Sequence, residues 1–311
     1  MTQGIAAVDF RRWSSDPAGF AHELGASFER FGFAVVANHG LSQALIERCL
    51  GDFKGFFAWP VEAKMRYHVP GSGGARGYTP FGVEAAKGAA MHDLKEFWHV
   101  GRELPAGHRY RRYMPDNLWI DGIEGFRDTT LALWEAFDAM GRELLSAIAL
   151  HLGLPPRWFD DKVSEGNSVL RVIHYPPVAD GGGAIRAGAH EDINAITLLL
   201  GAEEAGLQVL DRDGRWLDIN PAPGTLVCNI GDMLQRLTNH VLPSTTHRVV
   251  NPAQERADRP RYSMPFFLHF NPDFEIRSLP ACVGPDRPDR YPDPITADEY
   301  LRQRLREIRL L

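Results

Sequence analysis

One short pattern among the histidines and carboxylates of this sequence can hold a metal ion. In the segment GAHEDINAITLLL, His190 and Asp192 are separated by one residue. On a β-strand such residues point to the same face, so an imidazole and a carboxylate project side by side while Glu191 points away. A third ligand is expected from another strand across a barrel, and His247 in STTHRVVNP is the leading candidate. Two histidines and one carboxylate on one face of an ion leave three positions open, which suits Fe(II) and oxygen chemistry.

A second pattern indicates a binding site for a carboxylate. Arg261 and Ser263 share one face of the strand that begins the segment RYSMPFFLHF. A guanidinium with a neighbouring hydroxyl suits a carboxylate, because it can form charge-assisted, bidentate hydrogen bonds. The apolar residues that follow predict a buried strand, and an arginine entering such a strand needs a partner. No acidic residue lies in the strand itself, so a bound carboxylate could be that partner.

The second half of the chain supplies the strands that must hold these side chains. From Ser168 onward, short β-branched or aromatic runs are separated by Gly, Pro, Asn and Asp, and Asp213 and Gly214 mark a hairpin. Six or more such strands at short spacing predict a sandwich or a jelly roll. Thr296 and Glu299 form a capping box that opens a final helix.

The first half of the chain is predicted to be mainly helices with loops. Asp16 and Pro17 are a cap and first-turn pair for one helix, and a second is expected over residues 42–57. The apolar run GFAVVANHG between them is closed by a glycine and predicts a short strand. Residues 124–152 carry the clearest helical spacing of apolar side chains. Residues 70–90 are rich in Gly, Pro and Ala and predict a long irregular loop, a kind of segment that is usually functional or mobile.

Composition excludes several classes of protein. The 311 residues include 34 Lys and Arg against 40 Asp and Glu, and the net charge of −6 argues against a broad nucleic-acid surface. No apolar run approaches the length of a membrane span, and no signal peptide is evident. Three widely spaced cysteines exclude a disulfide framework. We therefore expect a cytoplasmic protein, a monomer or weak homo-oligomer that needs no metal to fold.

Together these segments resemble the isopenicillin N synthase-like family of Fe(II)- and 2-oxoglutarate-dependent oxygenases over almost the full length of the chain. GFAVVANHG and DLKEFWHVG look like the family's N-terminal region. The H-x-D pattern, the distal histidine and the R-x-S pattern each occupy their own strand, in the family's order and spacing. That combination is highly specific, whereas H-x-D alone is weak in a chain with 12 histidines.

The resemblance implies a fold that is mainly β with α, in which a double-stranded β-helix or jelly-roll core is flanked by N-terminal helices and a C-terminal helix. It implies one compact unit over residues 1–311. Its expected parts are an N-terminal helical and loop region at 1–120, a scaffold helix at 121–165, the catalytic core at 166–275 and a C-terminal extension and helix at 276–311.

By the same resemblance, His190, Asp192 and His247 correspond to the Fe(II) ligands of the family. The implied enzyme is a dioxygenase that uses O2 to decarboxylate 2-oxoglutarate to succinate and CO2. It couples this reaction to hydroxylation or another oxidation of a small organic substrate. Ascorbate is expected to be useful as a reductant.

The resemblance also assigns the cosubstrate site. Arg261 and Ser263 match the pair that holds the distal carboxylate of 2-oxoglutarate, and Tyr175 matches a tyrosine that assists them. The chain departs from the family at Ile173, where an asparagine is frequent. This departure removes one polar contact near the cosubstrate and leaves the ion pair with Arg261 in place.

Three alternatives remain open from the sequence. An isopenicillin N synthase-type oxidase keeps the same patterns but uses a different electron source. An ethylene- and succinate-forming enzyme breaks down 2-oxoglutarate itself. A zinc hydrolase or an inactive binding module could use the same fold, but such a protein would leave Arg261, Ser263 and Tyr175 without a role.

Candidates for the substrate pocket are aromatic and histidine side chains that could equally pack in the core. They are Tyr78 and Phe81 in the Gly-rich loop, Phe97 and His99 in KEFWHVG, and Phe267 and His269 on the strand after R-x-S. A pocket with several aromatics suits a small or medium organic substrate.

Overall fold

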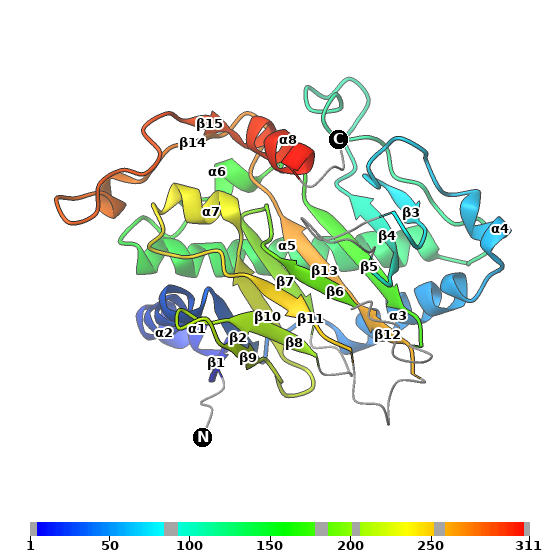
Figure 1. Ribbon diagram of the computed structural model, residues 1–311, viewed down its shortest axis with the longest axis horizontal. Helices are drawn as coiled ribbons and strands as arrows, with labels where there is room; N and C mark the ends of the chain where they lie inside the picture. The colour runs from blue at the N-terminus through cyan, green and yellow to red at the C-terminus, as the bar shows by residue number, and fades with distance from the viewer. Residues whose placement is uncertain (1–4, 84–92, 178–185, 201–205, 252–258, 308–311) are drawn as a thin grey trace.

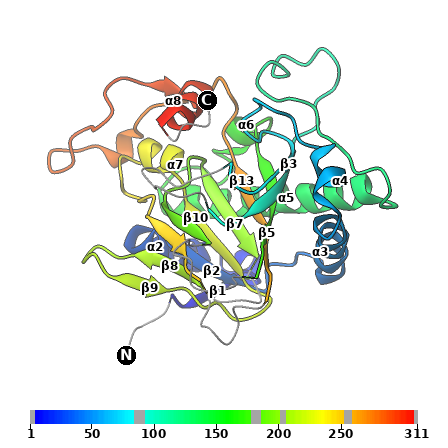
Figure 2. The ribbon, with the colours of Figure 1, turned by 45° about the vertical axis from the view of Figure 1, so that its right-hand side comes forward.

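Two β-sheets lie face to face, and helices cover the outer face of the larger one (Figures 1 and 2). The computed structural model describes residues 5–83, 93–177, 186–200, 206–251 and 259–307. The longest helix, α5 (Phe126–His151), runs along the larger sheet on the side away from the smaller one (Figure 1). This arrangement is the jelly roll predicted from the sequence, with helices added on one side.

The larger sheet draws its strands from both halves of the chain. Within the described residues its order is β1 (Ala7–Asp9), β2 (Phe33–Ala37), β10 (Leu226–Ile230), β7 (Ile196–Leu200), β13 (Pro265–Leu268), β5 (Val169–Tyr175), β4 (Glu96–Gly101) and β3 (Gly77–Thr79), and β12 (Arg261–Ser263) pairs with β5 beside this path. The smaller sheet has the order β6 (Ala187–His190), β11 (His247–Val249), β8 (Leu207–Leu210) and β9 (Trp216–Asp218). A short third sheet pairs β14 (Glu275–Ile276) with β15 (Ile295–Thr296).

The other helices are short or lie toward the ends of the chain. They are α1 (Arg12–Ser15), α2 (Pro17–Phe31), α3 (Gln43–Phe57), α4 (Val61–Met65), α6 (Asp160–Val163), α7 (Asp232–Leu237) and α8 (Ala297–Glu307), with a 3-10 turn at Pro280–Cys282. None of the helices in the described ranges is both long and apolar enough to cross a membrane.

The main hydrophobic core lies between α5 and the outer face of the larger sheet. Phe137 of α5 and Phe266 of β13 are fully buried, and their rings stack with centroids 5.5 Å apart. The alternation of strand residues sends Phe266 and Leu268 to this core, whereas Phe267 between them faces the smaller sheet. The larger sheet therefore has an apolar outer face and an inner face that is free to carry chemistry.

Most of the predicted elements are confirmed. Asp16 caps α2 by accepting a hydrogen bond from the amide of Gly19, and Thr296 and Glu299 form the predicted capping box. The hairpin around Asp213 joins β8 to β9. Local capping and turn chemistry identified these elements because it depends only on residues close together in the sequence.

The N-terminal region differs from the prediction of helices and loops. Strands β1 and β2 form one edge of the larger sheet, and β4 and β3 form the other. Strand β3 lies inside the segment expected to be an irregular loop, and residues 84–92 of that segment are outside the described part of the chain. The strand predicted in GFAVVANHG is confirmed as β2, whereas β1, β3 and β4 were not predicted. Strand β4 escaped prediction because its partner β5 lies far away in the sequence.

A glycine at the end of β10 allows two backbone segments to approach closely. A Cβ at Gly231 would lie 2.1 Å from the carbonyl oxygen of Asn194, in the loop that carries Asp192. The amide of Gly231 donates to the carbonyl of Ala195, and the amide of Asp232 donates to the carbonyl of Asp192. Backbone packing thus places this loop against the start of α7.

We expect Gly231→Ala to lower the free energy of unfolding by about 1–3 kcal/mol, because the new methyl group overpacks a rigid backbone contact. The matched control is Gly51→Ala in α3, where a Cβ would meet nothing within 4 Å. That change should raise the free energy of unfolding by up to about 1 kcal/mol, because alanine has the higher helix propensity. Chemical denaturation of both variants measures the difference, and equal effects would contradict the packing argument.

Candidate metal centre and carboxylate site

The smaller sheet brings two histidines side by side. Strand β6 ends at His190, β11 begins at His247, and the two residues pair directly. Their ring centroids are 4.4 Å apart. His247 therefore comes from the neighbouring strand of the same sheet, and the prediction of a strand across the barrel was wrong on this point.

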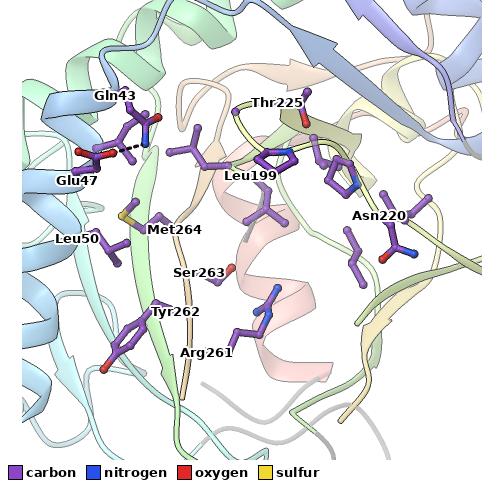
Figure 3. Close-up of a pocket in the computed structure, with 18 of the residues that line it drawn as sticks. Gln43, Glu47, Leu50, Leu199, Asn220, Thr225, Arg261, Tyr262, Ser263 and Met264 are labelled. Atoms are coloured by element: carbon purple, nitrogen blue, oxygen red, sulfur yellow. Dashed lines mark hydrogen bonds between the residues drawn. The ribbon is translucent and has the colours of Figure 1, made fainter. Parts of the chain in front are cut away.

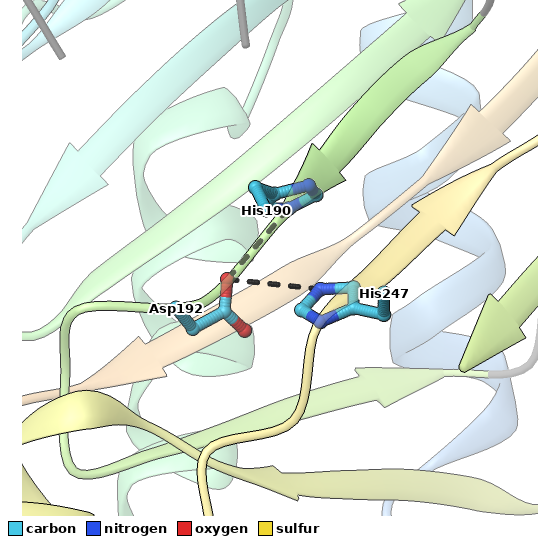
Figure 4. A group of neighbouring side chains, drawn as sticks. All are labelled: His190, Asp192 and His247. Atoms are coloured by element: carbon cyan, nitrogen blue, oxygen red, sulfur yellow. Dashed lines mark ion pairs between the residues drawn. The ribbon is translucent and has the colours of Figure 1, made fainter. Parts of the chain in front are cut away.

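Asp192 completes the group from the loop that follows β6. Its Oδ1 atom lies 3.9 Å from Nε2 of His190 and 3.9 Å from Nε2 of His247 (Figure 4). One ligand atom from each residue lies within 4.8 Å of the others, and in the described part of the chain this is the one such group of three. Asp192 is beyond the last residue of β6, so the strand alternation assumed for the H-x-D pattern does not apply to it. The loop nevertheless turns its carboxylate to the same point.

Backbone carbonyl groups fix the orientation of both imidazoles. The Nδ1 atom of His190 lies 2.8 Å from the carbonyl oxygen of Gly188, and that of His247 lies 3.1 Å from the carbonyl oxygen of Thr245. Because a carbonyl oxygen only accepts, each Nδ1 carries the proton and donates it. Each Nε2 atom then keeps its lone pair, and both lone pairs face Asp192, as metal ligation requires.

The two carboxylate oxygens of Asp192 face different sheets. Its Oδ2 accepts hydrogen bonds from Oγ1 of Thr197 at 2.6 Å and from Nδ2 of Asn229 at 2.8 Å. Thr197 lies on β7 and Asn229 on β10, directly opposite each other on the inner face of the larger sheet. Oδ1 thus remains directed at the histidines, and the carboxylate is prepared to bind an ion through one oxygen.

The electrostatics of the group favour the protonation states that bind metal. Burial, together with the charge of His247, lowers the pKa of His190 to about 4, so its imidazole is neutral near pH 7. Burial by itself would raise the pKa of Asp192, but the two histidines and the hydrogen bonds from Asn229 and Thr197 outweigh it and hold that pKa below its usual value. Two imidazoles and one carboxylate are a donor set that fits a divalent first-row metal.

The predicted carboxylate-binding side chains lie on the inner face of the larger sheet. Arg261 pairs with Tyr175 and Ser263 with Ile173, across strands β12 and β5. Arg261 is buried, and its guanidinium carbon lies 5.2 Å from the centroid of the Tyr175 ring. The structure thus brings together the three side chains expected to hold the cosubstrate, with Ile173 as an apolar neighbour.

A cavity of about 750 Å³ opens beside these side chains, between the open end of the barrel and α3. Arg261 and Ser263 line it (Figure 3). A cationic fork and a hydroxyl on a mainly apolar wall suit one end of a small dianion. The residues present therefore fit an oxoacid cosubstrate as well as a metal.

Four of the six substrate candidates follow the inner face of the larger sheet. Phe97 and His99 alternate on β4, and Phe267 and His269 lie on and just beyond β13. Burial lowers the pKa of His269 to about 4. Phe267 pairs with Thr197, whose hydroxyl donates to Asp192. These four side chains are placed where a substrate could meet the metal.

The other two candidates lie elsewhere. Tyr78 pairs with Trp98 on the core face of the sheet, is 1% exposed and donates its hydroxyl to Glu96. Phe81 is 41% exposed and lies edge-on to His174. Alternation along β3 turns Tyr78 away from the inner face, which corrects the sequence-based list, whereas Phe81 lies beyond the end of that strand and stays a candidate.

The sequence analysis missed Thr197 and Asn229. Each is a polar residue at an inward position of an otherwise apolar strand, in AITLLL and LVCNI. That signal was available, since a buried polar side chain needs a partner. It also missed Arg171, which lies between Phe97 and Phe267 and donates from Nε to Nε2 of His99 at 2.6 Å.

Two family models match the chain. Residues 166–270 match the model of the 2OG-Fe(II) oxygenase superfamily. Residues 5–122 match the model of the N-terminal region of the non-haem dioxygenases in morphine synthesis.

Similar proteins cover nearly the whole chain. A 2-oxoglutarate-Fe(II) type oxidoreductase of Emericella nidulans is 33% identical, over 92% of this chain and 83% of the relative. The crystal structure of a 2OG-Fe(II) oxygenase family protein from Caulobacter crescentus is 58% identical and has a TM-score of 0.93, with 99% and 100% of the two chains covered. A full-length protein of Neurospora crassa, crystallised in complex with α-ketoglutarate and thymine, is 30% identical with a TM-score of 0.86, over 97% of this chain and 96% of that one.

The geometry of the His190, Asp192 and His247 group and these relatives agree on one assignment: the chain belongs to the 2OG-Fe(II) oxygenase superfamily and is a 2-oxoglutarate- and Fe(II)-dependent dioxygenase.

Proposed function

We propose that the chain binds Fe(II) through His190, Asp192 and His247 and uses it to hydroxylate or otherwise oxidise a small organic molecule. The observation that carries this proposal is the convergence of two Nε2 atoms and one Oδ1 atom on a single point, with both imidazole tautomers fixed by backbone carbonyls. The distal carboxylate of 2-oxoglutarate is held by Arg261 and Ser263. Tyr175, opposite Arg261, supports the guanidinium from the paired strand.

Bound Fe(II) supplies the activation of O2 that oxidises 2-oxoglutarate to succinate and CO2 and then the substrate. The residues of the chain bind the metal, orient the cosubstrate and shield the site from water. Thr197 and Asn229 occupy Oδ2 of Asp192, so Asp192 would hold the ion through Oδ1. Arg261 aligns the cosubstrate by a bidentate contact, because two N–H groups of a guanidinium can donate to the two oxygens of one carboxylate.

The substrate wall is aromatic and carries one cation. Phe97, Phe267 and His99 surround Arg171 on the inner face. A planar, polar molecule of moderate size could stack on this wall and accept hydrogen bonds from it. The thymine complex of the Neurospora crassa relative supports a small ring compound as the first class to test. We further propose a cytoplasmic monomer or weak homo-oligomer that acts on free metabolites and not on nucleic acid or membranes, in keeping with the net charge of −6.

The first test is a succinate-release screen with Fe(II), ascorbate and 2-oxoglutarate against free pyrimidines, amino acids and other small metabolites. We expect substrate-dependent succinate with a matching amount of oxidised product. Oxidation of a substrate without consumption of 2-oxoglutarate would identify an isopenicillin N synthase-type oxidase. Ethylene in the headspace would identify breakdown of 2-oxoglutarate itself, and stoichiometric zinc with no turnover would favour the hydrolase or binding-module alternative.

His190→Ala should abolish iron binding and leave the fold intact, because one of three protein ligands is lost while the core on the other face of the larger sheet is untouched. Metal analysis after anaerobic purification measures the iron content, and circular dichroism checks the fold. His22→Ala, at an exposed position of α2, is the matched control and should keep its iron. Unchanged iron in His190→Ala would move the ligand role to another residue.

Arg261→Lys should raise the Kd for 2-oxoglutarate about 10- to 100-fold. A lysine keeps the charge but loses the fork, and a hydrogen bond to a charged group contributes about 1.5–3 kcal/mol. Isothermal titration of Mn(II)-loaded protein measures the Kd without turnover. An unchanged Kd would contradict the proposed cosubstrate site.

A further inference from the structure

Strand β12, which carries Arg261 and Ser263, is held to the larger sheet on one side. It has three residues, and in the described part of the chain it pairs only with β5. The two side chains proposed to hold the cosubstrate thus lie on a short strand that is paired on one side. Something other than a second neighbouring strand must set their position.

The middle residue of the strand, Tyr262, points to the other face of the sheet. Figure 3 shows Tyr262 on one side of β12 and Arg261 and Ser263 on the other. Tyr262 pairs across the strands with His174, and their rings stack with centroids 4.9 Å apart and planes 16° apart. Phe57 of α3 stacks on His174 as well, at 5.4 Å and 30°. The imidazole thus stacks on two aromatic rings, and Phe81 lies edge-on to it.

His174 is in turn anchored to β4. It pairs with Glu96, and its Nδ1 donates to Oε1 of that carboxylate at 2.7 Å. Glu96, His174 and Tyr262 therefore form a row across three adjacent strands on the outer face. In the register of these strands, each member of the row is next to an inner-face residue of the active site.

Glu96 is a firm anchor for this row. It is 1% exposed and accepts hydrogen bonds from Nζ of Lys64 at 2.7 and 3.0 Å and from the hydroxyl of Tyr78. Burial by itself would raise the pKa of Glu96, but the hydrogen bonds from His174, Lys64 and Tyr78 hold it below its usual value. The carboxylate therefore stays ionised and remains a strong acceptor for His174.

We propose that His174 is a positioning residue for the cosubstrate: held by Glu96, it stacks on Tyr262 and so fixes β12 with Arg261 and Ser263 in place. This inference rests on the proposed role of Arg261 and Ser263. His174 does not line the cavity, and Tyr262 borders it from the side of β12 opposite to Arg261 and Ser263, so both act through the strand. Their removal should therefore weaken the binding of 2-oxoglutarate while leaving the proposed metal ligands, which lie on β6, on β11 and in the loop after β6, in position.

The test is a double-mutant cycle on 2-oxoglutarate binding, measured by isothermal titration of the full chain loaded with Mn(II). We expect His174→Ala and Tyr262→Ala each to raise the Kd about tenfold, the scale of one aromatic pair. The double variant should have the same Kd for 2-oxoglutarate as either single variant, because both changes remove the same contact. Tyr262→Phe keeps the ring, so its Kd for 2-oxoglutarate should stay within about twofold of the Kd of the parent protein.

Two further measurements separate positioning from a general loss of structure. In turnover assays His174→Ala should raise the KM for 2-oxoglutarate and leave kcat at saturating cosubstrate within about twofold. In the metal-free protein, backbone amide exchange of residues 261–263 should be faster in His174→Ala, because β12 opens more readily. Without His174, Glu96 still accepts hydrogen bonds from Lys64 and Tyr78, so its buried carboxylate keeps partners.

The matched control is Tyr291→Ala. Tyr291 stacks on His240 with centroids 5.7 Å apart and planes 13° apart, in the segment that leads into β15, and β15 lies across the molecule from β12 (Figure 1). Tyr291→Ala should leave the Kd for 2-oxoglutarate unchanged.

If His174→Ala lowers the number of 2-oxoglutarate sites per chain and leaves the Kd unchanged, the inference is overturned. Additive changes in the free energy of 2-oxoglutarate binding in the double variant would also overturn it. If Arg261→Lys raises the Kd and His174→Ala does not, this inference fails and the proposed function stands. If Arg261→Lys has no effect, the proposed cosubstrate site fails first.

Discussion

The buried carboxylate of Asp192 joins the two sheets, and the geometry of the site depends on how it does so. One oxygen accepts hydrogen bonds from Thr197 and Asn229 of the larger sheet, and the other faces His190 and His247 of the smaller sheet. Burying a carboxylate costs several kcal/mol unless its lone pairs are satisfied. The two hydrogen bonds provide part of that compensation, and the face directed at the histidines is completed when a cation binds. The same interaction therefore supports the fold and prepares the metal site.

The position of that carboxylate depends on backbone packing more than on strand periodicity. Asp192 lies beyond the end of β6, in a loop that the amides of Gly231, Asp232 and Met233 hold through its carbonyl groups. Gly231 permits this approach because it has no Cβ. The H-x-D pattern thus identifies two of the residues that the structure brings together, while the geometry of their approach comes from the start of α7.

Neighbouring residue pairs of strands β12 and β5 lie on opposite faces of the larger sheet and have different roles. On the inner face, Arg261 and Tyr175 meet across β12 and β5 beside the cavity. On the outer face, the neighbouring pair of Tyr262 and His174 packs on α3 and is anchored through Glu96. Strand alternation makes this possible, since a rigid outer contact can set the position of an inner side chain without occupying the site.

The sequence alone determined the chemistry-bearing residues, the main helices and the jelly-roll class, because these depend on short-range spacing, capping and alternation. Thr296 with Glu299 and the Asp213 hairpin are signals of that kind. Tertiary structure alone decided which distant strands pair. That pairing put His247 beside His190, added β1 to β4 to the larger sheet and turned Tyr78 into the core. It also decided that Thr197 and Asn229 hold Asp192. The reason is that strand pairing and register join residues far apart in the chain, and a local pattern does not encode which partner a strand will meet.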